Sequence, residues 1–278
     1  MEIRIFRSDD IDFAIEMTKA EGWLSETREV FRDFFIFQPD GCFIAEEEGE
    51  RIGMIVATPY GLDGFIGELI VDPAWRGSGR GKALMEHAMA FHAACGVKNI
   101  HLDGVVAAVP LYERLGFRKV CRSLRFTGEL TNTQTNMAEV MKESDLPEVL
   151  DLDRRAFGAD RSFFLRQKRM RSKDTCYVHR SRGRITGYLF AAGGKVINIG
   201  PWVEEHPVDS QNLLLALGSA NQGRQIRIGV LENNEAAVEM LRNLGFNIDI
   251  HSPWRMVIGQ SGLGESSRCI AIGSPAAG

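Results

Sequence analysis

Apolar and polar positions alternate along this chain in patterns that separate short strands from helices. Residues 65–71 form an apolar, β-branched run, whereas the apolar positions of residues 83–91 recur with the period of a helix. Between these two segments lie three glycines at alternate positions, Gly77, Gly79 and Gly81. The pattern predicts a strand, a glycine-rich turn and then a helix.

The same order of elements occurs twice. Three segments of the first half resemble three segments of the second half in the same order, namely residues 5–11 and 140–146, 42–45 and 176–179, and 115–117 and 244–246. Each half reads as strand, helices, hairpin, strand, helix, strand and helix. At 278 residues the chain is also long enough for two medium-sized domains. The repeat therefore predicts two similar α/β domains joined near the polar residues 131–136.

The glycine-rich turn has the chemistry of a pyrophosphate site. Glycines let the backbone come close to a ligand, and free amides at a helix start favour a phosphate. Arg76 and Arg80 add charged donors. An ATP-type P-loop does not fit, because Arg76 and Ala83 stand where it needs Gly and Ser or Thr; the spacing G-x-G-x-G also differs from that of dinucleotide-binding turns. A turn without any ligand is the alternative.

Two motifs carry a resemblance to a known family. Residues 71–81, with the pattern V-x-P-x-x-R-G-x-G-x-G, resemble the acetyl-CoA pyrophosphate motif of the GNAT superfamily of N-acetyltransferases. Residues 111–117 resemble the second signature of that family, a helix that bears a Tyr and ends in Gly-Phe. Three short segments, residues 21–23, 102–103 and 270–275, resemble a tandem group of the family with an active N-terminal domain and a degenerate C-terminal domain.

The resemblance implies a fold and a cosubstrate. The expected fold is α/β (α+β), with two tandem GNAT-like domains that are each a mixed, mostly antiparallel twisted sheet flanked by helices. We expect the acetyltransferase domain at residues 1–130 and the degenerate domain at residues 137–278, in which residues 268–272 dock as a strand. Acetyl-CoA is expected to bind the first domain through Leu69, Ile70, Val71, Arg76, Gly77, Ser78, Gly79, Arg80, Gly81 and Lys82.

The second copy has lost the glycine-rich turn. Where the first half has residues 73–81, the second half offers residues 201–210, which contain no glycine. The segment carries three acidic side chains that would repel a pyrophosphate and a proline that lacks an amide donor: Glu204, Glu205, Asp209 and Pro207. Leu241 stands where the first half has Tyr112. We expect this copy not to hold CoA in the usual way.

Two side chains are candidates for the chemistry of acetyl transfer. Glu68 lies on the strand that leads into the turn, where GNAT proteins often carry a carboxylate, and could take the amine proton directly or through a water. The alternative is an exposed carboxylate on the solvent side of the strand. Tyr112 matches the general acid of the family, since a phenol is protonated at neutral pH and can hydrogen-bond a departing thiolate. Its alternative is a packing aromatic residue.

The resemblance also implies contacts for the carbonyl oxygen and for the acceptor. A backbone amide among residues 69–71 is expected to bind the developing oxyanion. Trp23 and Glu26 lie where GNAT enzymes commonly shape the acceptor pocket, although core packing of Trp23 is an equal alternative.

Composition and charge narrow the classes of function. A net charge of −4 and a pI near 5.9 argue against general binding of nucleic acid or of an anionic membrane. No apolar run approaches the ~18 residues that span a bilayer, and residues 1–5 begin directly with strand-like alternation, so a cytoplasmic protein is expected. The five cysteines and six histidines show no metal-ligand spacing, so no metal is expected.

Two charged runs have simple interpretations. The acidic residues 46–50 are expected to form a solvated hairpin turn. Between residues 151 and 184, Lys and Arg outnumber Asp, which predicts a solvated helix face or, less simply, attraction of an acidic substrate.

Together these observations predict an acetyl-CoA-dependent N-acetyltransferase in which a primary amine attacks the thioester directly. A non-catalytic CoA-binding or regulatory module and an acyltransferase that uses another acyl-CoA are the alternatives. The sequence leaves the amine acceptor, small molecule or peptide, and the oligomeric state open.

Overall fold

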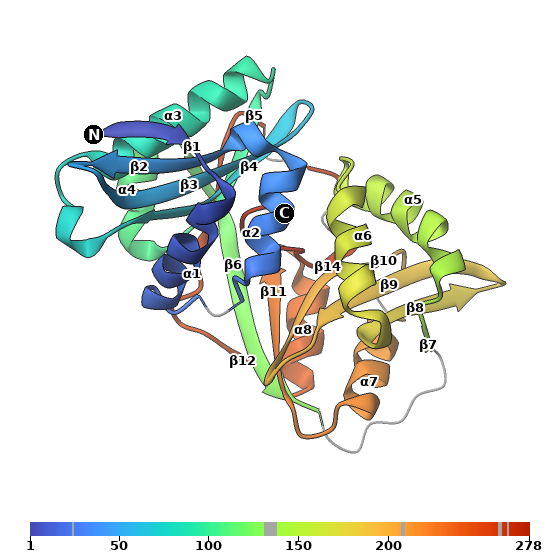
Figure 1. The fold of residues 1–278 in the computed structure, drawn as a ribbon. Coiled ribbons are helices and arrows are strands. Elements are labelled where there is room, and N and C mark those ends of the chain that lie inside the picture. The colour runs from blue at the N-terminus through green and yellow to red at the C-terminus, as the bar shows by residue number, and fades with distance from the viewer. Residues whose placement is uncertain (24, 131–137, 207–208, 261–262, 266) are drawn as a thin grey trace.

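The computed structural model describes residues 1–23, 25–130, 138–206, 209–260, 263–265 and 267–278. Two α/β lobes share one continuous sheet, and helices cover the faces of that sheet in each lobe (Figure 1). The expected linker at residues 131–136 and the predicted loss of an amide at Pro207 lie outside the described residues.

The first lobe takes its elements in the order that the sequence pattern predicts. They are β1 (Glu2–Ile5), α1 (Ile11–Ala20), α2 (Arg28–Phe37), β2 (Cys42–Glu47), β3 (Glu50–Tyr60), β4 (Asp63–Val71), α3 (Arg80–Ala94), β5 (Asn99–Gly104), α4 (Val109–Arg114) and β6 (Arg118–Glu129). The run at residues 65–71 is the buried part of β4, because its alternate apolar side chains face helices on both sides of the sheet.

The second half of the chain repeats this order and adds strands near its end. Its elements are β7 (Ala138–Val140), α5 (Leu146–Phe157), α6 (Ser162–Arg171), β8 (Cys176–Ser181), β9 (Arg184–Ala192), β10 (Val196–Glu204), α7 (Ser210–Ala220), β11 (Gln225–Leu231), α8 (Glu235–Asn243), β12 (Asn247–Ile248), β13 (Trp254–Ile258) and β14 (Cys269–Ala271). The strand expected at residues 268–272 is confirmed as β14.

The internal repeat is confirmed in local detail. Asp10 accepts the backbone amide of Arg7 at 2.7 Å, and Asp145 accepts the amide of Lys142 at 2.8 Å. An arginine from a neighbouring strand then binds each carboxylate, Arg4 at Asp10 and Arg180 at Asp145, both at 2.7 Å. The two halves therefore start their first helices by the same arrangement.

The lobes exchange strands rather than standing side by side. The strand order is β1-β2-β3-β4-β5-β13-β6-β11-β10-β9-β8-β7. β6 is one long strand whose residues 118–122 pair with β13 and whose residues 123–129 pair with β11. β13, although late in the chain, fills the place between β5 and β6 in the first lobe. Each lobe thus contains a strand from the other half of the sequence.

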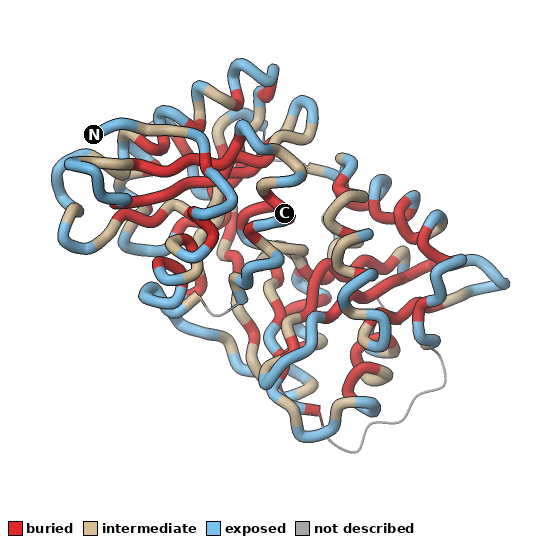
Figure 2. The backbone as a smooth tube through the Cα atoms, in the orientation of Figure 1, coloured by how far each residue is buried: buried red, intermediate tan, exposed pale blue. Residues whose placement is uncertain are grey.

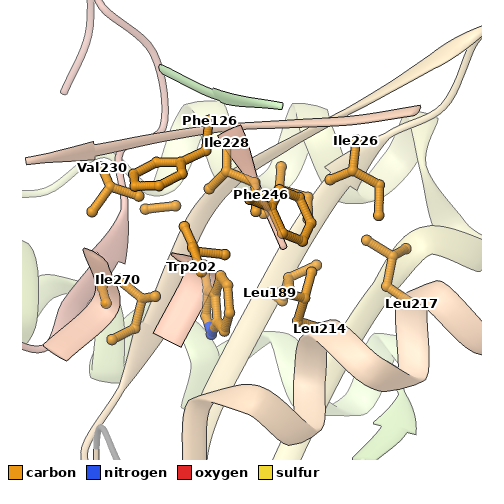
Figure 3. Packing of buried hydrophobic residues seen from close by; sticks show 14 of the residues in the cluster. Phe126, Leu189, Trp202, Leu214, Leu217, Ile226, Ile228, Val230, Phe246 and Ile270 are labelled. Atoms are coloured by element: carbon orange, nitrogen blue, oxygen red, sulfur yellow. The ribbon is translucent and has the colours of Figure 1, made fainter. Parts of the chain in front are cut away.

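Burial follows the sheet through both lobes (Figure 2). In the second lobe, Phe126 of β6 and Ile270 of β14 pack with Trp202 of β10 in the same apolar cluster (Figure 3). Between the lobes, aromatic rings of α2 meet those of α6, with Phe37 and Phe164 centred 4.8 Å apart. The junction is therefore packed like a core.

A buried charge cluster lies where the exchanged strands meet. Asp103 of β5 accepts hydrogen bonds from Arg255 of β13 at 2.6 Å and from Arg125 and Ser123 of β6 at 2.8 and 2.6 Å. Burial alone would raise the pKa of Asp103, but the two guanidinium groups lower it to about 2. Asp103 thus ties three strands from both halves of the chain together.

Candidate active site

A β-bulge in β4 positions the first candidate residue. Gly67 pairs with Val56 and Ile70 pairs with Met54, so Glu68 and Leu69 together oppose one residue of β3. Glu68 takes a φ of 53°, a left-handed conformation that is uncommon for a residue with a side chain. The bulge thus contains Glu68, the predicted base, and Leu69, one of the residues 69–71 whose backbone amides are predicted to bind the oxyanion.

The Glu68 carboxylate is buried, which excludes the surface alternative. The residue is 6% exposed, and its Oε2 has no hydrogen-bond partner. Burial, with the negative charge of Glu26 nearby, raises the pKa of Glu68 well above its usual value. Glu26, in the connection between α1 and α2, has its own pKa raised by burial. The structure thus brings these two predicted site residues together.

The sheet opens next to the bulge. β4 and β5 are parallel, but they pair only through residues 63–65 and 99–101. Beyond Phe65, β4 keeps its pairing with β3, while β5 pairs with β13 on its other side. The separation of β4 and β5 begins two residues before Glu68 and leads towards the glycine-rich turn.

The glycine-rich turn forms the start of α3, as the sequence predicts. Gly77 and Gly79 have φ values of 82° and 86°, and a Cβ on either would meet no atom within 4 Å, so their surroundings are open. The amides in the first turn of α3 have no partner within the helix. Ser78 and Lys82 are exposed. The turn therefore offers free backbone donors and room for a phosphate to approach closely.

Acidic residues hold the two arginines of the turn. Arg76 binds the carbonyl oxygen of Val71 at 2.7 Å and forms an ion pair with Glu21. Arg80 binds Glu47 through two hydrogen bonds of 2.7 and 2.8 Å and stacks over Trp75. Glu47 belongs to the acidic run at the β2–β3 hairpin that the sequence predicts to be a solvated turn, and in the structure its partly exposed side chain also forms an ion pair with Arg80.

Tyr112 lies on α4 and is 7% exposed. Its ring packs edge-on against Phe117 and so closely against Gly104 that a Cβ there would lie 2.8 Å from the ring. Burial raises the pKa of Tyr112 to about 12, so the phenol keeps its proton at neutral pH. The ring therefore packs in the core and also presents a protonated hydroxyl.

Trp23 packs in the core, which is one of the two interpretations that the sequence left open. It is partly buried and packs against the apolar cluster beneath α1 and α2, and its amide donates to the carbonyl oxygen of Thr18 at 2.8 Å. The structure thus gives Trp23 a packing role, whereas Glu26 lies near Glu68.

The second lobe has the same bulge with different residues. Ile199 pairs with Ala191 and Trp202 with Leu189, so Gly200 and Pro201 take the places of Glu68 and Leu69. The sequence comparison that set Pro201 against Pro73 is therefore wrong by several residues, because short motifs cannot locate a bulge. This lobe has no carboxylate at the bulge, and Pro201 has no amide hydrogen to offer.

A strand also fills the opening beside this second bulge. β14 pairs with β10 at Trp202 and Val203, and the amide of Ile272 donates to the carbonyl oxygen of Gly229 on β11 at 2.9 Å. A Cβ on Gly200 would lie 1.9 Å from the carbonyl oxygen of Ile272. The gap that is open between β4 and β5 is thus occupied between β10 and β11.

One functional candidate escaped the sequence analysis altogether. Lys168 of α6 reaches across the lobe boundary, and its positive charge acts on Glu26. Burial and the neighbouring Arg161 lower the pKa of Lys168 to about 8. Lys168 lies in the basic region of residues 151–184, but nothing in that run distinguishes it from its solvated neighbours.

Comparisons with known proteins agree with both lobes. The profile of the Acetyltransferase (GNAT) family matches residues 7–117, and that of the Acetyltransferase (GNAT) domain matches residues 149–270. The mycothiol acetyltransferase of Thermobispora bispora is 39% identical over 93 residues, 30% of this chain and 32% of that protein. The chain thus matches only about a third of that relative.

Two further proteins align over most of the chain. The uncharacterized N-acetyltransferase YitH of Bacillus subtilis is 25% identical over 219 residues, which cover 74% of this chain and 73% of that protein. The crystal structure of an acetyltransferase-like protein of Pyrococcus horikoshii covers 100% of this chain and 95% of its own, with a TM-score of 0.84 and 23% identity. At that identity the structural likeness establishes the fold alone.

Two features are absent from the described parts of the chain. No group of three or more His, Cys, Asp or Glu side chains there is arranged to hold a metal ion. Among the described helices, none has both the length and the apolar character needed to cross a membrane.

Proposed function

Because the chain belongs to the GNAT superfamily of acetyltransferases and carries two GNAT domains in tandem, we propose that its first domain transfers an acetyl group from acetyl-CoA to a primary amine. The buried, unpartnered carboxylate of Glu68 at the β4 bulge is the observation that carries this proposal. A group that must accept a proton from a substrate needs such a free lone pair near the opening of the sheet.

The residues of the glycine-rich turn fit acetyl-CoA. Gly77 and Gly79 leave open space where a side chain would stand, and the first turn of α3 supplies free amides to a pyrophosphate. Arg76 and Arg80 would exchange part of their contacts with Glu21 and Glu47 for phosphate oxygens. When bound, the cosubstrate supplies an activated acetyl thioester.

Three groups of the first domain would share the chemistry. Glu68 takes a proton from the amine, directly or through a water, because its raised pKa makes it a better base than an exposed carboxylate. The amide of Leu69, in the bulge, donates to the carbonyl oxygen as negative charge develops there. Tyr112 keeps its proton at neutral pH and can give it to the departing thiolate. The amine attacks directly, so no acyl-enzyme forms.

We further propose that the second domain does not bind acetyl-CoA. β14 occupies its sheet opening, and Pro201 removes the amide that Leu69 offers in the first domain. One relative is a mycothiol acetyltransferase, and this similarity favours a small-molecule acceptor over a protein. The odd number of cysteines, which stand unpaired in the structure, favours action in the cytoplasm.

Thiol release is the direct test. Incubating the protein with acetyl-CoA and a panel of primary amines should release free CoA thiol at a rate that depends on the amine, and Glu68→Gln should abolish that dependence. CoA binding by calorimetry serves as the control in both proteins. Measurable CoA binding without amine-dependent thiol release across the panel would instead identify a CoA-binding module.

A further inference from the structure

The last residues of the chain fold back into a closed loop after β14. The carbonyl oxygen of Gly278 accepts the amide of Gly273 at 2.9 Å, and the amide of Gly278 donates to the carbonyl oxygen of Ser274 at 2.9 Å. We call residues 273–278 the tail loop. Ala276 and Ala277 within it are 1% and 6% exposed. A segment this buried belongs to the core of the protein.

Lys168 of α6 and Arg161, the residue just before this helix, anchor the tail loop to the second domain. Lys168 donates to the carbonyl oxygen of Gly273 at 3.0 Å and to that of Gly200, in the second bulge, at 2.7 Å. Arg161 donates to the carbonyl oxygen of Gly278 at 2.8 Å and is itself held by Asp153 at 2.8 Å. Because Arg161 is buried and Lys168 is partly buried, these bonds are largely shielded from water and fix both ends of the loop.

The middle of the tail loop presses against the first domain. Thr58 donates to the carbonyl oxygen of Ala276 at 3.4 Å, and Tyr60 donates to that of Ala277 at 3.1 Å. A Cβ on Gly67 would lie 2.1 Å from the Cβ of Ala276. The glycine is therefore required for this close approach, and it immediately precedes Glu68.

The tail loop lies on the face of the sheet that α1 and α2 cover. Ala276 and Ala277 belong to the same apolar cluster as residues of both helices and of β3 and β4. The α1–α2 connection brings Glu26 to Glu68 on this face, and Lys168 brings its charge from the second domain. Elements of both domains thus surround the proposed base.

We propose that the tail loop is one wall of the acceptor pocket and that the side chain at position 276 limits the size of the amine that reaches Glu68. This inference rests on the proposed acetyltransferase function. The second domain, through Lys168 and Arg161, holds that wall in place and so determines acceptor size. An alanine facing a glycine is nearly the smallest pair of residues that such a wall can have.

Removing the methyl group of Ala276 tests the wall. Ala276→Gly removes this methyl group without adding any atom to the contact with Gly67. In Ala276→Gly, the ratio of kcat/KM for phenethylamine or tryptamine to kcat/KM for ethylamine should rise about tenfold. Ratios that are unchanged in Ala276→Gly would overturn the proposal.

Two variants of α6 keep the proposal testable if Ala276→Gly does not fold. Lys168→Met removes the bonds to Gly273 and Gly200 while it keeps most of the side-chain volume, and it should relax selectivity in the same direction. Arg166→Met, on an exposed position of the same helix, should leave the ratios at the wild-type values. Equal ratios in Lys168→Met and Arg166→Met would contradict the anchoring role of Lys168.

A measurement without acetyl transfer separates this proposal from the function on which it rests. Carbodiimide coupling of methylamine or tryptamine to Glu68, read by mass spectrometry, reports which amine reaches the carboxyl group. Ala276→Gly should raise tryptamine coupling at Glu68 about tenfold relative to methylamine. If no amine is acetylated yet this shift occurs, the acetyltransferase proposal fails and the wall stands. If the coupling ratio stays unchanged, the wall fails whatever the activity.

Discussion

Glu68 and Gly200 occupy the same position in two copies of one β-bulge. In the first copy the residue is a buried carboxylate followed by Leu69, which has a backbone amide hydrogen. In the second it is a glycine followed by Pro201, and its carbonyl oxygen binds Lys168. The same bulge thus carries the proposed base in the first domain, whereas in the second domain it binds the lysine that anchors the tail loop.

The Glu26–Glu68 pair predicts a pH dependence. Glu68 must be deprotonated to act as a base, so kcat/KM should rise with pH as the solution passes the raised pKa of Glu68. Glu26→Gln removes the nearby negative charge, lowers that pKa and should move the rising limb to lower pH. Glu29→Gln, an exposed change on α2, is the control. An unmoved limb in Glu26→Gln would show that the two carboxyl groups are not coupled.

Tyr112→Phe should lower kcat about a hundredfold, because the departing thiolate loses its proton donor. The ring packing against Phe117 and Gly104 is retained, so the melting temperature and the affinity for CoA should change little. Steady-state rates and thermal melting measure the two effects separately. Unchanged turnover would remove Tyr112 from the mechanism.

Arg76→Glu should abolish CoA binding by the whole chain, with a loss of at least about a hundredfold in affinity. The change places a second carboxylate beside Glu21 at the glycine-rich turn, while the second domain has β14 in its opening. Arg184→Glu makes the same charge change at an exposed hairpin and should bind CoA normally. Appreciable calorimetric binding left in Arg76→Glu would reveal a second site.

Asp103→Asn should destabilise the protein by about 3 kcal/mol, because Arg255 would lose its buried partner. The folded-state pKa of Asp103 lies at about 2, below the ordinary value for Asp, so its stabilisation is full above the ordinary value. It is lost as pH falls through the folded pKa. Urea unfolding between pH 7 and pH 2 should therefore show a smaller difference between wild type and variant at the acid end.

The sequence predicted the features that depend on residues close to one another in the chain. The glycines predicted a turn that a ligand can approach closely, and Gly77 and Gly79 lie in such an open turn; the repeated segments predicted the repeated helix starts and hairpins. The burial of Glu68 did not follow from the pattern, because a bulge breaks the alternation on which such predictions rest.

The features that the sequence did not predict depend on contacts between residues far apart in the chain. Nothing in residues 254–258 indicates that they leave their own domain to pair with β5, and nothing in the tail indicates that Ala276 faces Gly67. Arg80 and Glu47 likewise meet although they lie 33 residues apart in the sequence. Such contacts join residues whose sequence neighbours carry no sign of the partner.

The exchanged strand β13 constrains how the protein can be made. A ribosome delivers β1 to β6 long before residues 254–258, so the first sheet emerges with an empty place between β5 and β6. The first domain must wait for nearly the entire chain before its sheet can close, since pairing across so long a separation is slow. Synthesis of the first half alone would yield a sheet with two unpaired inner edges and a tendency to aggregate.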